Sequence, residues 1–161
     1  MEWQLRHQRD LSTQELYDVL ALRAAVFVVE QDCSYLDPDG QDLVDDVHHL
    51  LGFDDGQLVA AARLLPPEHP VPGHRPDATE TRHVHLGRIV VAGTHRGTGL
   101  GRELVARSVA AGEQLWPGVP QEMAAQAHLA DFYGRFGFAS VSGVYDWDGI
   151  DHVDLVRTTG A

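Results

Sequence analysis

The chain has 161 residues, of which 43% are hydrophobic and 22% charged, and this length and composition predict one soluble globular domain spanning residues 1–161. Its formal net charge of −12 argues against nucleic-acid binding, which depends on basic side chains that neutralise phosphates. With no apolar run long enough to cross a membrane, no signal-peptide pattern and one cysteine, Cys33, the expected compartment is the cytoplasm.

The first part of the chain predicts a strand and then a helix. Residues 3–7 are expected to form a short strand, and Ser12 with Glu15 has the spacing of a capping box at a helix start. Apolar residues repeat after it at helical spacing and predict one buried face: Leu16, Val19, Leu20, Val26 and Phe27. Arg23 lies on the same face, so its guanidinium needs a partner or a path to water.

An acidic segment follows, with five aspartates between Asp37 and Asp46. Two interpretations stay open: a solvated loop of Asx turns, or a wall of negative charge that attracts a protonated amine. A calcium loop fits poorly, because Asp37-x-Asp39-Gly40 lacks the glycine and the glutamate that an EF-hand needs at fixed later positions.

Residues 48–53 and 58–65 predict two strands joined by a short turn at Asp54-Asp-Gly56. Residues 66–81 are rich in proline and lack periodicity, which predicts a surface loop carrying His69 and His74. The histidines of the chain do not group at metal-ligand spacing, so we expect no metal site.

The centre of the chain, Leu86 to Arg102, has the order strand, glycine-rich turn, helix. Residues 86–92 form an apolar run that predicts a buried strand, and apolar residues from Leu100 onward repeat with helical period. Glycines at 97, 99 and 101 permit a sharp turn. The N–H groups that open the helix, together with its dipole, favour a bound phosphate.

The kind of phosphate ligand follows partly by exclusion. A dinucleotide fingerprint fails because Leu104 stands where the third glycine is needed, and a P-loop fails because the chain has no lysine. Arg96 and Arg102 flank the turn and carry planar donors suited to a diphosphate.

The last third predicts a strand at 122–126, a short helix at 128–136 closed by Gly137, and strands at 141–145 and 151–157 around a turn. The whole order predicts a mixed α/β domain, with a single mixed central sheet and helices on both faces.

Several motifs carry a family resemblance. Arg96-x-x-Gly99-x-Gly101 resembles the acetyl-CoA-binding motif of the GNAT N-acetyltransferase superfamily, and Phe132-Tyr-x-x-x-Gly-Phe138 resembles its second motif. Nearly the whole chain resembles the ElaA-like branch of that superfamily. The stretches that carry this resemblance are Leu22-Arg-x-x-Val-Phe-Val-Val-Glu-Gln31, Asp39-Gly-x-Asp42, Gln126-Ala-His-Leu-Ala-Asp-Phe-Tyr133 and Tyr145-x-x-Asp-Gly-Ile150 with His152.

The resemblance implies a GNAT fold, in which the central strands splay apart and CoA lies in the gap, its pantetheine amides pairing with freed backbone groups. It implies backbone contacts to CoA from the central strand and a diphosphate site on the turn, with Gln126 as a further contact. The residues concerned are Ile89, Val90 and Val91 of the strand, then Arg96, Gly97, Thr98, Gly99, Leu100, Gly101 and Arg102.

The implied reaction is transfer of an acetyl group from acetyl-CoA to an amine of a cationic small molecule or peptide, by direct attack and without a metal. Tyr133 takes the role of the acid that protonates the departing thiolate. An amine must lose its proton before it attacks, and Glu30 and His85 are the candidate bases. Cys33 is interpreted as a buried inert thiol rather than an acyl-enzyme nucleophile.

Other activities stay open. Acyl-homoserine-lactone synthases share the Arg-x-x-Val-Phe stretch with this branch, and a non-catalytic acyl-CoA-binding domain would use the same glycine-rich turn. A homodimer is compatible with the sequence, which does not define the oligomeric state.

Overall fold

The computed structural model describes residues 1–69 and 82–158. Its strands are β1 (Glu2–His7), β2 (His48–Asp54), β3 (Gln57–Leu65), β4 (Val84–Val91), β5 (Gln121–Gln126), β6 (Ala139–Ser140), β7 (Tyr145–Trp147) and β8 (Ile150–Arg157). Its α-helices are α1 (Thr13–Arg23), α2 (Leu100–Leu115) and α3 (Ala130–Gly134), and a π-helical segment, Ala24–Glu30, continues α1.

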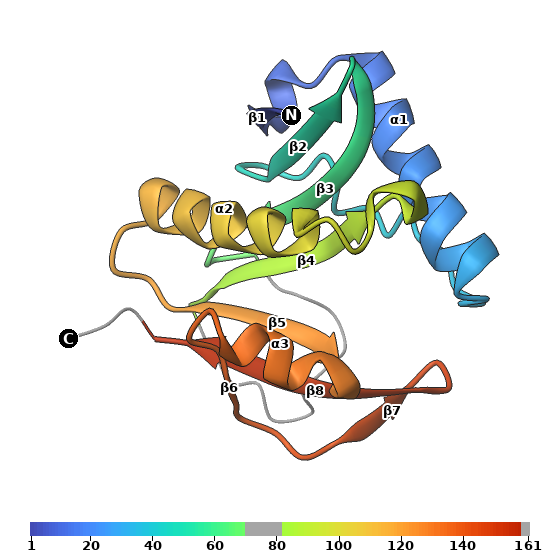
Figure 1. The fold of residues 1–161 in the computed structure, drawn as a ribbon. Coiled ribbons are helices and arrows are strands. Elements are labelled where there is room, and N and C mark those ends of the chain that lie inside the picture. Colours follow the sequence, from blue (N-terminus) through green and yellow to red (C-terminus); the bar gives the residue numbers. More distant parts are fainter. Residues whose placement is uncertain (70–81, 159–161) are drawn as a thin grey trace.

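All described strands belong to one mixed sheet, in the order β1-β2-β3-β4-β5-β8-β6, with β7 paired to β8. Neighbouring strands are antiparallel except β4 and β5, which are parallel. These two pair only where they begin, Val84 with Gln121 and His85 with Glu122. Beyond that point they diverge, as Figure 1 shows. The predicted mixed α/β class with splayed central strands is therefore confirmed.

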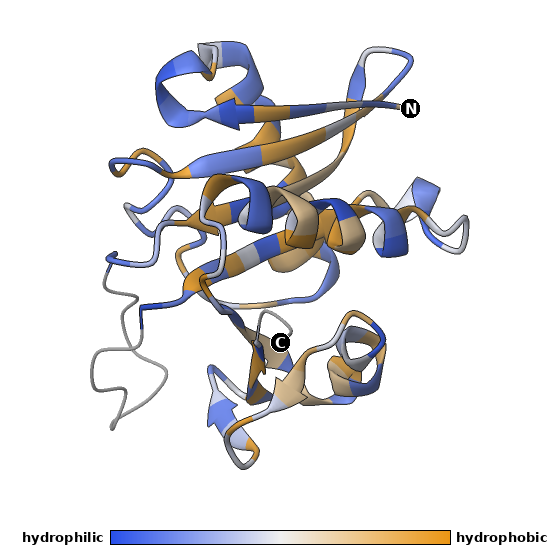
Figure 2. Cartoon of the chain, turned by 90° about the vertical axis from the view of Figure 1, so that its left-hand side faces the viewer, coloured by the Kyte–Doolittle hydropathy of each residue, from blue (hydrophilic) through white to orange (hydrophobic). Residues whose placement is uncertain are grey.

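The helices cover the two faces of the sheet. The core on one face joins α2 and α3 to the strands and includes Leu104, Val105, Met123, Tyr133 and Leu155. On the other face α1 and the π-helical segment pack against the sheet through a smaller cluster: Val19, Val26, Leu51, Leu58, Ala61 and Val90. Helix α2 shows both colours in Figure 2, because its apolar side faces the sheet and its polar side faces water.

Helix α1 begins as its capping box predicts. The Glu15 N–H donates to Ser12 Oγ at 3.1 Å, and the Ser12 N–H donates to Glu15 Oε2 at 2.8 Å. Of the expected apolar stripe, Val19 and Val26 are buried, and so is Arg23, whose partners belong to the acidic segment. None of the helices in the described ranges is long and apolar enough to cross a bilayer.

Two sequence-based boundaries were wrong. The strand expected at 141–145 is irregular up to Tyr145, because Ser142-Gly143 interrupts it and leaves Val141 and Val144 exposed. The helix expected at 128–136 is α-helical only at Ala130–Gly134, after a 3-10 turn at Ala127–Leu129. The loop expected at 66–81 lies outside the described residues from residue 70 onward, and His74 with it.

Candidate active site

A cavity of about 230 Å³ lies where β4 and β5 separate. On one side it is lined by Leu86, Ile89 and Tyr133, which belong to or pack against the core under α2. On the other side it is lined by residues from the π-helical segment and the loop after it: Phe27, Gln31, Cys33 and Tyr35. The cavity is therefore lined by residues from both the α3 face and the α1 face of the sheet.

Strand β4 carries a bulge beside this cavity. Its register with β3 shifts between Ala61 and Arg63, and Arg88 has a φ of +50°. Beyond the bulge, the Ala92 N–H donates to Val59 O at 2.8 Å, so alternation turns the backbone of Val90 toward β3. Ile89 and Val91 then turn their peptide groups toward the split, where they face no strand.

The glycine-rich turn has the shape of an anion site. Gly97 and Gly99 have φ of +74° and +92°, a region that favours glycine, and Gly99 is the N-cap of α2 without a side-chain cap. The backbone N–H groups of residues 97–101 donate to no backbone acceptor in the described part of the chain. A Cβ built at 97, 99 or 101 meets nothing within 4 Å. The first turn of α2 thus has free donors, open space and a favourable dipole for a phosphate.

Side chains beside this turn differ in how they are held. Thr98 Oγ1 donates to His95 O at 2.7 Å. Leu100 is buried in the core, so only its backbone can face a ligand, and Arg102 is exposed.

Arg96 is paired with Glu30 from the end of the π-helical segment. Its Nη2 donates to Glu30 Oε2 at 3.1 Å, its Nη1 donates to the second carboxylate oxygen, and Nη2 and Nε also contact Val91 O. Glu30 therefore lies beside the glycine-rich turn and not among the residues that line the cavity. The structure places this candidate base at the expected diphosphate site.

Tyr133 reaches the cavity from α3. It is 8% exposed, and its ring packs against Phe132 and Phe138 with centroids 5.1 and 6.4 Å away. Burial raises the pKa of Tyr133 to about 12, because the phenolate would lose its hydration. The hydroxyl therefore stays protonated at neutral pH and can donate a proton.

His85 lies at the closed end of the split and does not line the cavity. With His83 it faces Glu122 of β5: His83 Nδ1 is 3.1 Å from Glu122 Oε2, and His85 Nδ1 is 3.8 Å from Oε1. Burial would raise the pKa of Glu122, but hydrogen bonds and charge from the two histidines outweigh it and lower the pKa to about 2. This cluster joins β4 to β5 before they separate.

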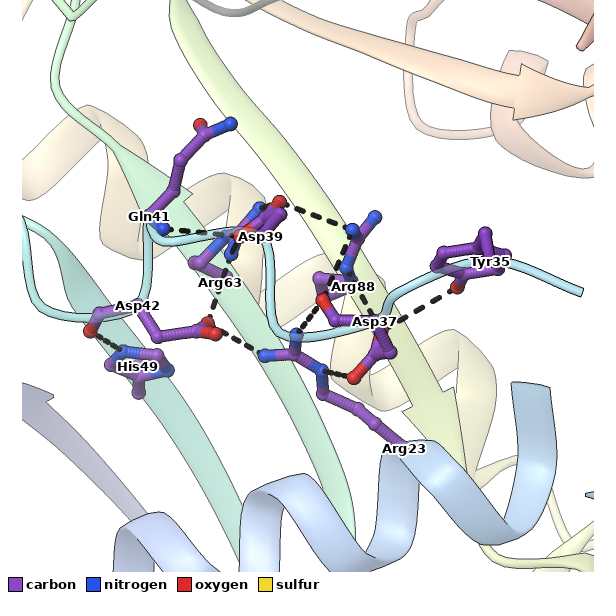
Figure 3. Close-up of polar contacts among 9 residues, drawn as sticks. All are labelled: Arg23, Tyr35, Asp37, Asp39, Gln41, Asp42, His49, Arg63 and Arg88. Carbon is purple, nitrogen blue, oxygen red and sulfur yellow. Dashed lines mark hydrogen bonds and ion pairs between the residues drawn. The ribbon is translucent and has the colours of Figure 1, made fainter. Parts of the chain in front are cut away.

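Three aspartates of the acidic segment form a buried ion-pair network with three arginines, drawn in Figure 3. Arg23 bonds Asp37 at 2.8 Å and Asp42 at 2.6 Å. Arg63 of β3 bonds Asp39 through both of its terminal nitrogens at 2.7 Å, and Asp42 at 2.9 Å. Both expectations for this segment were wrong for these three residues. Asp37 and Asp42 are buried, Asp39 is half-buried, and all three are paired with arginines rather than available to attract an amine.

Arg88 connects this network to the cavity. From the β4 bulge it contacts Asp37 and Asp39 at 3.1 Å, and its guanidinium carbon lies 5.4 Å from the centroid of the Tyr35 ring. Tyr35 and Arg88 both line the cavity. The network therefore holds the loop after residue 30 against the bulge and shapes the α1 side of the cavity.

Acid is expected to destabilise this arrangement. Burial would raise the pKa values of Asp39 and Asp42, but their arginine partners outweigh it and lower both, as the histidines lower that of Glu122. A carboxylate whose pKa is lowered by folding stabilises the folded state fully when the pH is above the pKa of the same group in the unfolded chain, about 4. That contribution is lost as the pH falls toward the lowered pKa of the folded state. The free energy of unfolding in urea should thus decline from about pH 5 toward about pH 2. Glu122→Gln should flatten part of that decline, and an unchanged slope would contradict this account.

Sequence reasoning did not assign to the candidate site several residues that line the cavity: Phe27, Tyr35, Arg88, Trp147, Asp148 and Ile150. They come from segments far apart in the chain, and only the fold brings them to one place. The sequence offered two signals for the residues near the C-terminus: the alternation of apolar and polar side chains along β8 and the turn at Asp148-Gly149. Neither signal indicates that β4 and β5 separate and form a cavity there. In the described ranges no group of three or more His, Cys, Asp or Glu side chains could hold a metal ion.

The sequence motifs indicated a sheet that splits between two central strands and a glycine-rich turn at the start of a helix. The structure has both features, at β4 and β5 and at the start of α2. The sequence profile of the Acetyltransferase (GNAT) family matches residues 13–138. The chain therefore belongs to the GNAT family of acetyltransferases.

Within this family, the chain is 41% identical to Protein ElaA of Escherichia coli strain K12, over 98% of this chain and 96% of ElaA. The crystal structure of E. coli ElaA superposes with a TM-score of 0.84 and 42% identity, covering 97% of this chain and 98% of that one. An acyl-CoA N-acyltransferase from Pseudomonas aeruginosa gives a TM-score of 0.87 and 44% identity, covering 98% and 99% of the two chains. The resemblance to the ElaA-like branch is confirmed.

The acyl-homoserine-lactone synthase LasI shares the fold, with a TM-score of 0.74 over 98% of this chain and 89% of its own. Its sequence identity is 18%, so the likeness is one of fold alone.

Proposed function

We propose that this protein transfers an acetyl group from acetyl-CoA to an amine, by direct attack of the amine on the thioester. One observation carries the proposal: the split of β4 and β5 forms a cavity that the buried Tyr133 lines and to which residues from both faces of the sheet contribute. A donor and an acceptor can therefore meet there from opposite sides.

On the donor side, the diphosphate of acetyl-CoA would lie on the N–H groups of residues 97–101, with Arg96 and Arg102 as charged donors. The pantetheine arm would pair with the backbone of β4 from Ile89 to Val91, in which Ile89 and Val91 face the split. Gln126 lines the cavity at the end of β5 and offers a side-chain amide to the same arm. The residues present thus suit the diphosphate and the pantetheine arm of the donor.

The reaction needs an acid and an oxyanion site. As the amine nitrogen bonds to the carbonyl carbon, charge develops on the carbonyl oxygen, where a backbone N–H of β4 would stabilise it. The carbon–sulfur bond then breaks with its electron pair on sulfur. Tyr133 would donate its proton to that sulfur, a role that its raised pKa permits at neutral pH.

The acceptor is proposed to be a cationic amine. Asp37, Asp39 and Asp42 are neutralised by arginines and do not support this. Support comes instead from Asp148 at the cavity, together with the rings of Tyr35 and Trp147, because a carboxylate and aromatic faces both favour an ammonium group.

Release of free thiol from acetyl-CoA, measured with a panel of polyamines, arylalkylamines, amino acids and peptides, tests the proposal. Turnover with at least one amine and an acetylated product identified by mass spectrometry is expected. Tight CoA binding without thiol release from any amine would instead favour a binding domain. Transfer only from an acyl carrier to S-adenosylmethionine would favour a lactone synthase.

The position of Glu30 leads to a separate prediction. Glu30→Gln removes the carboxylate that pairs with Arg96, so the dissociation constant of CoA should fall by up to about fivefold, since an exposed pair is worth at most about 1 kcal/mol. The value of kcat should stay within about twofold, because Glu30 does not line the cavity. Calorimetry and steady-state kinetics measure the two effects. If Glu30 is the base instead, kcat falls by about 100-fold or more.

A further inference from the structure

His152 lies at the cavity on the side opposite Tyr133. It is paired with Gln126 across β5 and β8, and both residues line the cavity. The next residues along β8, Val153 and Leu155, belong to the same core as Tyr133. Because side chains alternate across a strand, His152 projects from the face where the π-helical segment and the loop after it lie. Tyr133 and His152 thus approach one space from the two faces of the sheet.

The hydrogen bond of His152 defines which ring nitrogen carries the proton. Its Nδ1 is 2.8 Å from the carbonyl oxygen of Ile150. A carbonyl oxygen only accepts, so Nδ1 is the donor, and in the neutral ring the lone pair belongs to Nε2. Two rings hold the imidazole: Tyr145 stacks on it with centroids 6.2 Å apart, and Trp147 lies 5.4 Å away. The ring is therefore oriented with a basic nitrogen available.

The other titratable or charged side chains around His152 are less suited to take a proton from an amine. Arg88 from β4 is a permanent cation, and burial raises the pKa values of Cys33 and Tyr35 from the loop and of Tyr133 from α3. On the β7 side, the Tyr145 hydroxyl donates to Asp154 at 2.7 Å. Asp148 offers an acidic side chain that suits attraction of an ammonium group, whereas imidazole is the side chain that ordinarily exchanges protons near neutral pH.

We propose that His152 is the general base of the reaction, an assignment that rests on the proposed acetyl transfer. Its Nε2 takes one proton from the acceptor ammonium, directly or through one water, and passes it to solvent. The freed lone pair forms the bond to the carbonyl carbon. The second proton lost by that nitrogen replaces the one that Tyr133 gives to the sulfur, so the products are an amide, the free thiol and one released proton.

The test compares His152→Asn with wild type on the most active amine from the thiol-release panel. Asparagine keeps a donor for the Ile150 carbonyl but removes Nε2. At about pH 7 we expect kcat/KM to fall about 100-fold, with the CoA dissociation constant unchanged by calorimetry. The difference in kcat/KM between His152→Asn and wild type should become smaller as the pH rises toward the pKa of the amine, because a larger fraction of the amine is then already deprotonated and needs no base. A mainly structural role would not produce that pH dependence.

A second variant distinguishes loss of the base from loss of the folded structure. His152→Ala leaves space beside the cavity, and added imidazole should restore part of its activity at about pH 7. His7→Asn, on β1 and away from the cavity, is the matched control and should keep wild-type kinetics. Activity of His152→Asn within about threefold of wild type across the pH range would overturn the assignment alone. A wild-type protein that binds CoA and acetylates no amine would overturn the proposed function and this assignment together.

Discussion

Replacing Tyr133 by phenylalanine is expected to lower kcat about 100-fold while the dissociation constant of CoA stays within about twofold. The substitution removes one oxygen from a side chain that is 8% exposed and keeps the ring contacts with Phe132 and Phe138. What it removes is the proton for the departing thiolate, which a hydroxyl with a pKa of about 12 retains at neutral pH. Thiol release under saturating acetyl-CoA measures kcat, and calorimetry measures CoA binding.

Tyr17→Phe is the matched control, because Tyr17 lies on α1 and is 68% exposed. It should leave both quantities unchanged. Robust turnover by Tyr133→Phe at the wild-type rate would show that the thiolate leaves without this acid. Loss of CoA binding together with kcat would instead assign Tyr133 to holding the donor.

Replacing Arg23 by methionine is expected to lower the free energy of unfolding by about 3–5 kcal/mol, since one partner of a buried ion pair is removed and a charge is left unpaired. Arg23 is 1% exposed and donates to Asp37 Oδ2, Asp37 O and Asp42 Oδ1 at 2.8, 3.0 and 2.6 Å. Methionine keeps much of the apolar stem, so the loss reports mainly on the guanidinium. Urea unfolding followed by tryptophan fluorescence at about pH 7 measures it.

Arg9→Met supplies the comparison. Arg9 pairs with Asp45 at 3.4 Å, with the side chains 69% and 90% exposed, and such a pair contributes less than about 1 kcal/mol. Equal losses for the two variants would mean that the network drawn in Figure 3 does not stabilise the fold. Because the network also shapes the α1 side of the cavity, Arg23→Met should raise KM for the amine more than KM for acetyl-CoA.

Local patterns predicted much of the fold correctly. The capping box at Ser12, the strand from residue 86 and the helix from Leu100 depend on interactions between residues close in sequence, and each formed at or near its expected position. The glycine-rich turn is equally local, because left-handed backbone at Gly97 and Gly99 follows from the residue type. The strand expected at 141–145 failed because an irregular segment with alternating apolar residues resembles an edge strand.

The candidate site was less predictable. Glu30 was expected to act as a base, yet it pairs with Arg96, a residue 66 positions away, because the end of the π-helical segment lies beside the glycine-rich turn. His85 was also expected to act as a base, but it lies on β4 at the closed end of the split, where it faces Glu122. In both cases the residue type suited catalysis, and position in space decided the contacts.

The sequence by itself determined the order of elements, the family and the glycine-rich turn at the start of α2, because each depends on short-range periodicity or on a motif within a few residues. Only the tertiary structure decided that three aspartates are neutralised by Arg23, Arg63 and Arg88, and that His152 and Tyr133 reach one cavity from opposite faces. Those relations depend on where β4 parts from β5 and on which strands become neighbours. They involve residues 14 or more positions apart in the chain, for which local spacing carries no signal.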